Sequence, residues 1–330
     1  MNTKEITFLT DSEIFGDNQL EIIKRNGTKA AVTDYAILLG GYVSNEYYAS
    51  GGNNLKERTG YWWSASPTAT DYVRVVDKYG SRIWTYYYKR NGAARPASSY
   101  TNLDLISPSV VRGKEGIAEV LYGEYPQFVV SERENARLEE LYKRNGLKKT
   151  GKFYTSDCHK WDDYNSGFTA MRHEELEYNG KKYVRVISKK SIHGNGDKKL
   201  SNGVLLRNID EQPVFVEVEP IPWLVDEKSK TLLSKRCLFS GVKFNSKKYD
   251  GNFQKTDIKK FIDTFFVNEM KTEKIFGTAT ETGEKEQSNK KNPYNFNFGY
   301  VSEEDIIGGA VESGVSVFLH GLSGDGKSAE

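Results

Sequence analysis

Three consecutive tyrosines, Tyr86, Tyr87 and Tyr88, end a strand-like stretch and constrain the fold more than any other feature of the sequence. This stretch, SRIWTYYYK (81–89), follows YVRVV (72–76), and the two alternate like paired strands around the turn DKYG. Because successive side chains of a strand point to opposite faces of a sheet, the three tyrosines cannot all enter one core. The sequence therefore predicts a β-hairpin on a loop-rich sheet, with part of its aromatic surface exposed.

Tyrosine is concentrated around this hairpin. It accounts for 21 residues, against 16 Phe and 5 Trp, and ten of the 21 lie within residues 42–100, among many Gly, Ser and Asn. Tyr-rich loops of this composition give a large contact area at low side-chain entropy cost, as in antibody combining sites. This favours recognition of a protein or peptide ligand. The alternative is that these tyrosines fill ordinary half-buried strands, since Tyr is a good strand former.

Charge and cysteine content narrow the classes of function. The chain has 47 Lys and Arg against 45 Asp and Glu, a net charge of +2, so a broad field for nucleic acid or anionic membranes is not expected. The start has no basic segment followed by an apolar one, and no long apolar run follows, so we expect a cytoplasmic protein without membrane attachment. Cys158 and Cys237 match neither a disulfide framework nor a zinc-site spacing.

The rest of the chain alternates strands with few helices, which predicts an α+β fold. Asn179-Gly180 marks the turn of a second hairpin, and Thr256 or Asp257 would begin a helix with a stripe of apolar residues.

The basic residues of the second hairpin region (181–200) are expected to be a solvated face, with nucleic-acid contact as the alternative. Cys158-His159, with Asp157, Asp162 and Asp163 close by, could suggest a metal site or a Cys/His nucleophile, but a polar loop explains this composition as well, and we predict neither. Further expected elements are a helix over 131–146 and strands over 214–226 and 230–239.

The end of the chain carries a phosphate-binding pattern. GLSGDGKS (321–328) satisfies G-x-x-x-x-G-K-[ST] after an apolar strand-like run, with Gly321, Gly324, Gly326, Lys327 and Ser328 as the cofactor-binding residues. In such a loop Lys327 reaches the β- and γ-phosphates and the Ser328 hydroxyl ligates Mg²⁺. Only two residues follow Ser328, so we expect no catalytic residues, no cofactor and no ATP hydrolysis in this chain, and ATP with Mg²⁺ in a longer protein.

The segment around this motif, EEDIIGGAVESGVSVFLHGLSGDGKSAE, resembles the start of a MoxR-type AAA+ ATPase. The resemblance implies an oligomeric ATPase in a longer protein. A stretch without large apolar residues, GTATETGEKEQSNKKNP, precedes it. We therefore expect a flexible linker over residues 276–295 and the fragment of an ATPase domain over residues 296–330.

A second resemblance involves GYWWSASP (60–67) and NGAARPASS (91–99). Together they resemble the C-terminal half of C-type-lectin-fold domains of the formylglycine-generating-enzyme type, as used in the variable proteins of bacterial diversity-generating retroelements. Three other segments, GEYPQ (123–127), PIPWLV (220–225) and KKFIDTFFVNEM (259–270), resemble the N-terminal half. In this chain the segments that resemble the C-terminal half come before those that resemble the N-terminal half, the reverse of the order in that family. Residues 1–275 would then be a circularly permuted domain with a variable half (1–105) and a framework half (115–275), or else two partly separate units.

The resemblance implies that the variable, ligand-binding positions lie within the interval from Tyr61 to Arg95. Trp62, Trp63 and Arg95 are expected to be scaffold residues, with one Trp in the core and its neighbour facing a surface or second layer. Neither enzymatic activity nor sugar binding is expected. The positions expected to vary and to face the surface are Ser64, Ala65, Thr68, Ala69, Thr70, Asp71, Tyr72, Asp77, Tyr79, Ser81, Trp84, Tyr86, Tyr87 and Tyr88.

The leading hypothesis is a ligand-recognition module coupled to an AAA+ ATPase. The alternatives are a P-loop NTPase whose N-terminal region is only regulatory, and a structural or assembly protein.

Overall fold

The computed structural model describes residues 5–48, 54–68, 72–89, 92–100, 111–112, 117–156, 170–188 and 198–270. All of them belong to one compact unit, residues 1–279. The fold is α+β, with mostly antiparallel sheets and few helices, as the sequence predicts. The phosphate-binding pattern, the expected linker and Cys158-His159 lie outside the described residues.

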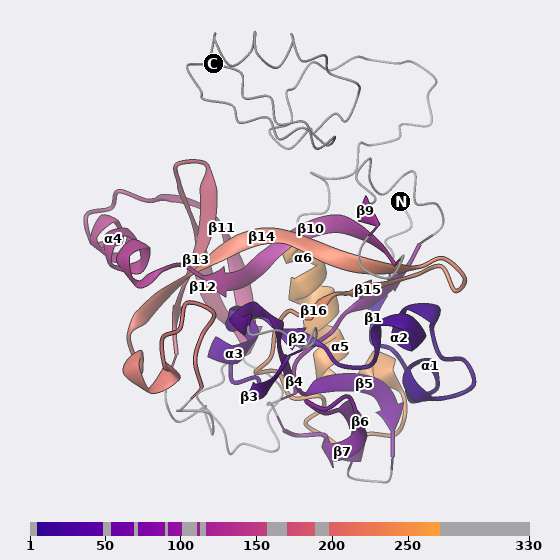
Figure 1. Cartoon of the computed structure of the whole chain (residues 1–330). Coiled ribbons are helices and arrows are strands. Elements are labelled where there is room, and N and C mark those ends of the chain that lie inside the picture. The colour runs from indigo at the N-terminus through magenta and orange to yellow at the C-terminus, as the bar shows by residue number, and fades with distance from the viewer. Residues whose placement is uncertain are drawn as a thin grey trace, which may run out of the picture. The chain divides into compact units, whose positions relative to one another are not determined.

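A nine-stranded sheet forms the larger part of this unit (Figure 1). Its strands are β1 (Ile6–Thr7), β8 (Ala97–Ser99), β9 (Val111–Arg112), β10 (Ala118–Val129), β11 (Lys148–Ser156), β12 (Ala170–Tyr178), β13 (Lys181–Ile187), β14 (Pro213–Asp226) and β15 (Thr231–Ser234). The order is β1-β8-β15-β14-β13-β12-β11, and β10 pairs with β14 and β9. β10 lies along most of β14, so β13 and β15 share the other edge of β14 at its two ends.

The sheet joins the two halves of the described chain. β8 pairs with β15, and β1 pairs with β8, so strands from the first hundred residues continue a sheet built mainly from residues 118–234. One hydrophobic core contains side chains from both halves, including Trp63, Tyr125 and Phe266. Residues 6–99 and 117–270 are therefore not separate structural units.

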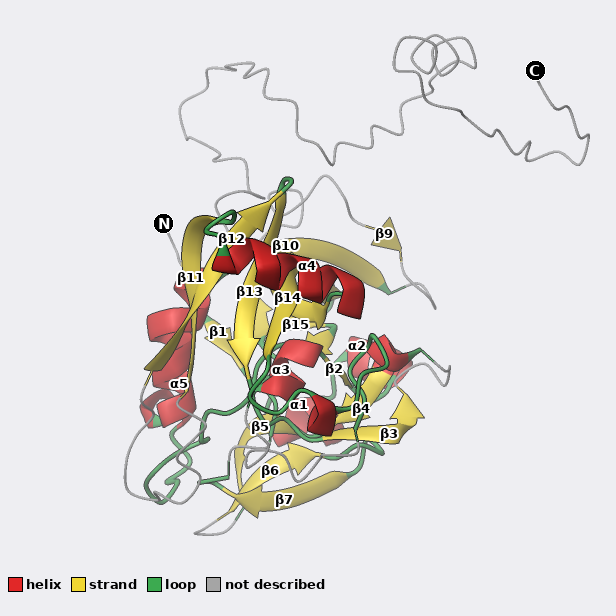
Figure 2. Ribbon diagram, turned by 90° about the vertical axis from the view of Figure 1, so that its left-hand side faces the viewer, coloured by secondary structure: helices red, strands yellow, loops and turns green. Residues whose placement is uncertain are grey.

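Two smaller sheets complete the strands. A four-stranded sheet has the order β16-β2-β4-β3, and a three-stranded sheet has the order β5-β6-β7. Both views place β6 and β7 at the far end of the described unit from β10 (Figures 1 and 2). The bounds are β2 (Ala31–Val32), β3 (Val43–Tyr48), β4 (Arg58–Gly60), β5 (Trp62–Pro67), β6 (Tyr72–Val76), β7 (Arg82–Tyr86) and β16 (Arg236–Cys237).

The helices are short, and their starts follow local capping rules. Ser131 accepts a hydrogen bond from the Glu134 N–H at the start of α4, and Thr256 accepts one from Lys259 at the start of α5. The expected helix over 256–270 forms, with a π-helical segment in its middle. Among the described helices, none has the length and apolarity needed to cross a membrane. The bounds are α1 (Asp11–Phe15), α2 (Glu21–Asn26), α3 (Asp34–Leu38), α4 (Glu132–Lys143), α5 (Asp257–Phe261), η6 (Ile262–Phe266), α6 (Val267–Glu269) and the 3₁₀ turns η1 (Leu55–Glu57), η4 (Leu206–Asn208) and η5 (Phe253–Lys255).

Candidate functional site

The predicted β6–β7 hairpin forms, and its two faces differ. Tyr72 lies opposite Tyr86, and Val75 lies opposite Ile83. Val73 and Val75 are fully buried, because alternate side chains of β6 point into the core, whereas Trp84 and Tyr86 of β7 are exposed. The hairpin is thus anchored by its valines and presents its aromatic residues outward.

Four of these residues form a continuous surface that we call the aromatic strip: Tyr72, Trp84, Tyr86 and Tyr88. The ring of Tyr72 meets Trp84 edge to face at 4.3 Å between centroids and lies 4.7 Å from Tyr86. Tyr86 in turn stacks on Tyr88 at 5.0 Å. The Tyr72 hydroxyl also donates to the Tyr86 hydroxyl at 3.3 Å. Offset and edge-to-face contacts of this kind hold aromatic rings in fixed relative positions.

The strip is the most exposed aromatic surface of the described residues. Trp84 is 55% exposed, Tyr86 is 37% exposed, and Tyr79 in the adjoining turn is 47% exposed. Only two other large hydrophobic side chains among the described residues are comparably exposed, Leu121 and Ile187, and both lie in the nine-stranded sheet. Clustered exposed aromatic side chains of this kind indicate an interaction surface.

A second cluster, the lysine–tyrosine cluster, consists of Tyr42, Tyr61, Lys78 and Tyr79. Tyr42 stacks on Tyr61 at 4.5 Å, and the Lys78 ammonium lies 5.0 Å from the Tyr79 ring and 5.9 Å from the Tyr42 ring. Burial raises the pKa of Tyr61, and the neighbouring Tyr42 raises it further. Burial acts to lower the pKa of Lys78, but the hydrogen bonds and charge interactions with Tyr42 and Tyr79 together outweigh it, so the pKa is raised and the lysine stays charged. Tyr42, Tyr61 and Lys78 were not among the expected binding residues; the general Tyr enrichment of residues 42–100 was the only signal for them.

Three of the residues expected to face the surface are buried, so the expectation is wrong for Ser64, Ala65 and Asp77. Ser64 and Ala65 lie in β5, where the Ala65 N–H donates to the Leu9 carbonyl and the Tyr249 hydroxyl donates to the Ala65 carbonyl. The Asp77 carboxylate instead accepts hydrogen bonds from the N–H groups of Tyr79 (2.9 Å) and Ser81 (2.7 Å). It closes the hairpin turn, and we assign it a structural role.

The remaining expected positions divide by exposure. Ser81 is exposed, Thr68 is half-buried, and the half-buried Tyr87 packs against the core while its ring also meets the Tyr88 ring of the strip edge to face at 5.6 Å. Thr70 and Asp71 lie outside the described residues, as do Ala69, Gly321, Gly324, Gly326, Lys327 and Ser328.

Buried side chains of β5 and of the segment after β7 join the three-stranded sheet to the core. Trp62 and Trp63 are both fully buried, so of the two expected alternatives, a surface or a second layer, the second buried layer agrees with their opposite directions. Arg95, also fully buried, donates from Nε to the Ser234 carbonyl at 3.0 Å and lies 5.0 Å from the Trp62 ring. Burial lowers the pKa of Arg95 to about 10. The residue still carries its charge at neutral pH and ties the strand after the hairpin to β15.

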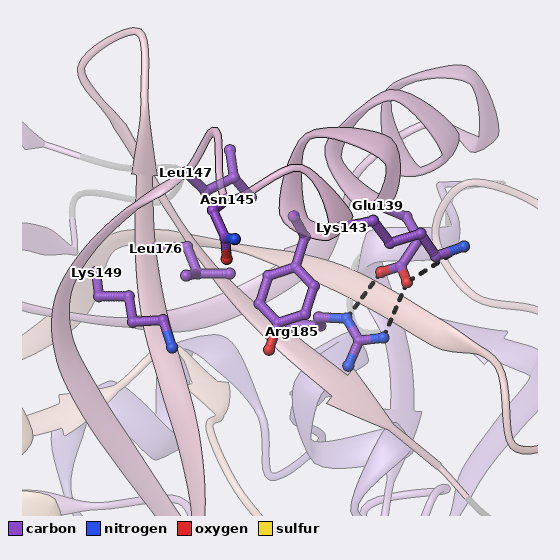
Figure 3. A pocket seen from close by; sticks show the side chains of 8 residues that line it. Glu139, Lys143, Asn145, Leu147, Lys149, Leu176 and Arg185 are labelled. Carbon is purple, nitrogen blue, oxygen red and sulfur yellow. Dashed lines mark hydrogen bonds and ion pairs between the residues drawn. The ribbon is translucent and has the colours of Figure 1, made fainter.

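The clearest pocket lies elsewhere, between α4 and the β12–β13 hairpin, with a volume of about 390 Å³ (Figure 3). Arg185 donates to both carboxylate oxygens of Glu139, at 2.8 and 3.0 Å, and lies over the Tyr142 ring. Lys149, at its rim, pairs with Glu174. Lys143 also pairs with Glu139, so Arg185 and Lys143 share one carboxylate, and the lining of the pocket carries more positive than negative charge.

The basic residues of the second hairpin, on β13, also pair with carboxylates. Lys181 pairs with Glu217 at 2.8 Å, and Lys182 pairs with Glu124 at 2.7 Å. These pairs, together with that of Arg185, neutralise the positive charge of β13. Within the described part of the chain, no group of three or more His, Cys, Asp or Glu residues could hold a metal ion.

Comparison with known proteins assigns no family. No family model, no curated protein and no solved structure matches the chain. The aromatic strip and the lysine–tyrosine cluster are therefore the candidate functional site on their geometry alone.

Proposed function

We propose that the described unit is a ligand-binding module that recognises a protein or peptide through the aromatic strip. The observation that carries this proposal is the position of Trp84 and Tyr86, which are exposed on a hairpin whose other face is anchored by buried valines. Exposed Trp and Tyr side chains held in place on a rigid support are the residues that dominate binding energy at protein interfaces.

The fold assignment is a proposal as well. A C-type-lectin-like domain with reversed order of its halves agrees with the shared core and with the buried Trp62, Trp63 and Arg95, which the resemblance implies as scaffold. A variable protein of a diversity-generating retroelement would use the exposed residues of β7 for diversification. A template repeat and a reverse transcriptase gene beside the coding sequence, with mismatches confined to template adenines over residues 61–95, would support this origin. Their absence would contradict it.

Coupling to an AAA+ ATPase rests on the phosphate-binding pattern and its sequence context. In a longer protein, ligand capture by the module would regulate the ATPase. The alternative function is a P-loop NTPase for which the described unit has only a regulatory or structural role. ATP hydrolysis by the 330-residue chain itself would favour that alternative.

A binding selection tests the central proposal. The chain would be used to select peptides from a random displayed library, and the selected peptides would be measured against a Trp84→Ala, Tyr86→Ala variant. The proposal expects these peptides to lose binding to this variant and to retain it with Leu121→Ala, which removes an equally exposed apolar side chain from β10. Equal binding to both variants, or no selectable peptide, would contradict the proposal.

A further inference from the structure

The edge of the three-stranded sheet suggests how a ligand would bind. β7 is the last strand of the order β5-β6-β7, and in both views it is the outermost strand of that sheet (Figures 1 and 2). An edge strand presents alternate backbone N–H and C=O groups to any chain that can pair with it. The first question is therefore which groups of β7 face outward.

The direction of each backbone group follows from the hydrogen bonds of β6. Thr68 donates to the Tyr72 carbonyl at 3.3 Å, so the backbone groups of Tyr72 face the β5 side. By alternation those of Val73 and Val75 face β7, which agrees with the bond from Asp77 to the Ser81 carbonyl at 3.0 Å. In β7, Ile83 and Thr85 lie opposite Val75 and Val73 and bond to β6. The backbone groups of Arg82, Trp84 and Tyr86 must then point away from the sheet.

Few of these outward N–H and C=O groups have a hydrogen-bond partner among the described residues. The Tyr86 carbonyl accepts from the Lys89 N–H at 3.1 Å, while the backbone groups of Arg82 and Trp84 bond to no other described residue. Natural edge strands are often protected by a proline, a bulge or a charged side chain. β7, RIWTY, has no proline and no bulge in its pairing with β6, its one charged residue, Arg82, is paired with Asp11, and Trp84 lies at its centre.

The positive charge of the hairpin favours an acidic partner. Residues 72–89 contain Arg74, Lys78, Arg82 and Lys89 and a single acidic residue, Asp77, whose carboxylate is buried in the turn. Arg82 pairs with Asp11 at 2.9 Å, whereas Arg74 forms no ion pair with any described residue. The surface beside the open edge is therefore positive, and it complements an acidic chain.

We propose that the open edge of β7 binds an extended acidic peptide segment of a partner protein, which adds as a fourth strand and packs its side chains on the aromatic strip. This inference rests on the proposed function and specifies its binding mode. An edge with both N–H and C=O groups matches a peptide backbone, whereas a nucleic-acid backbone would use the donors alone. A second copy of the hairpin is disfavoured because two basic edges repel each other.

A pair of substitutions at one position isolates the backbone contribution. Arg82→Pro removes an outward N–H that β6 does not use, whereas Arg82→Ala removes the same side chain and the same ion pair but keeps the N–H. Peptides selected from an acidic random library would be measured by fluorescence anisotropy. Strand addition expects Arg82→Pro to bind about tenfold or more weakly than Arg82→Ala, with similar urea unfolding of the two variants. Equal affinities would overturn the inference.

A second measurement uses the unaltered chain, so it remains decisive if Arg82→Pro fails to fold. Each amide of the selected peptide would be N-methylated in turn. Strand addition expects a period of two, with alternate methyl groups abolishing binding, and a loss of affinity as salt is raised. The absence of this period, tighter binding of an oligothymidylate, or a dimer of the chain that Arg82→Pro dissociates would each overturn the inference. If the peptides still required Trp84 and Tyr86, the proposed function would stand; if they did not, it too would fail.

Discussion

The ring of Tyr72 on β6 lies edge to face against the ring of Trp84 on β7, with 4.3 Å between their centroids, although both side chains stand on the outer face of the hairpin. This contact holds Trp84 in one orientation while more than half of its side chain stays exposed. A binding residue that is already fixed loses less entropy when a ligand arrives. The contact therefore prepares the surface for binding more than it stabilises the fold.

This relationship can be measured with a double-mutant cycle. We expect Tyr72→Ala and Trp84→Ala to be coupled by about 0.5–1.5 kcal/mol in urea unfolding, the usual range for an aromatic pair. Val75→Ala is the matched control, because it removes a fully buried side chain from the other face of β6. It should cost more than either surface substitution, about 2 kcal/mol. A larger loss of stability from Trp84→Ala than from Val75→Ala would show that Trp84 belongs to the core.

Asp77 should be a structural residue. Asp77→Ala leaves two turn N–H groups without their acceptor, so we expect a loss of about 1–3 kcal/mol in the free energy of unfolding. Asp77→Asn keeps an acceptor oxygen and should recover part of that loss. If Asp77→Ala kept full stability and lost only peptide binding, the assignment of Asp77 to the turn would be wrong.

A substitution at Gly92 tests whether the packing of the buried Trp63 stabilises the protein. A Cβ at this position would lie 2.3 Å from the Trp63 ring, so Gly92→Ala must displace a fully buried indole. We expect it to destabilise the protein by about 1–3 kcal/mol, measured by urea unfolding. The double substitution with Trp63→Phe makes room for the methyl group and should cost less than the sum of the two single changes. Strict additivity would contradict a direct clash.

Asp226 gives a pH dependence with a defined sign. Burial acts to raise its pKa, but hydrogen bonds from Ser229 and from Ile22, at the start of α2, outweigh it and hold the pKa below the ordinary value of 3.8. A depressed pKa in the folded state means that the ionised carboxylate stabilises the fold above the unfolded pKa, and that this contribution is lost as the pH falls through the folded pKa. We expect the stability difference between the unaltered chain and Asp226→Asn to be constant from pH 5 to 7, about one unit or more above both values, and to shrink below about pH 3.8. A difference that grew on acidification would contradict the assignment.

Local structure could be predicted where a short segment carries its own signal. The Asn179-Gly180 turn, the capped starts of α4 and α5, and the β6–β7 hairpin all depend on residues close in sequence. The pairing of β8 with β15 could not be predicted in this way, because it joins residues more than a hundred positions apart with no local pattern in common. The burial of Ser64 and Ala65 was missed for a similar reason. Their covering residues, Leu9 and Tyr249, come from distant parts of the chain.

The candidate site was predicted in outline. The Tyr enrichment indicated the hairpin, but a strand pattern does not say which of three adjacent tyrosines turns inward. Tyr87 does so, because it follows β7 at the point where its carbonyl accepts a hydrogen bond from Asn245. The stacking of Tyr42 on Tyr61 depends on the register of β3 against β4, in which the neighbouring Val43 lies opposite Gly60, and the local sequence pattern does not give this register.

The position of the supporting contacts along the chain also sets the order in which the protein can fold as it is synthesised. The β5–β6–β7 meander pairs near neighbours and is complete by residue 86, so it can form soon after it leaves the ribosome. Its support arrives much later, because Trp63 packs against Phe244 and Arg95 bonds to Ser234. Residues 9–28 can already contact the meander, but until about 150 further residues have been made it lacks its contacts with Phe244 and Ser234. A ribosome-bound chain that ends near residue 200 should therefore be a substrate for a holdase chaperone, whereas one that ends beyond residue 270 should not.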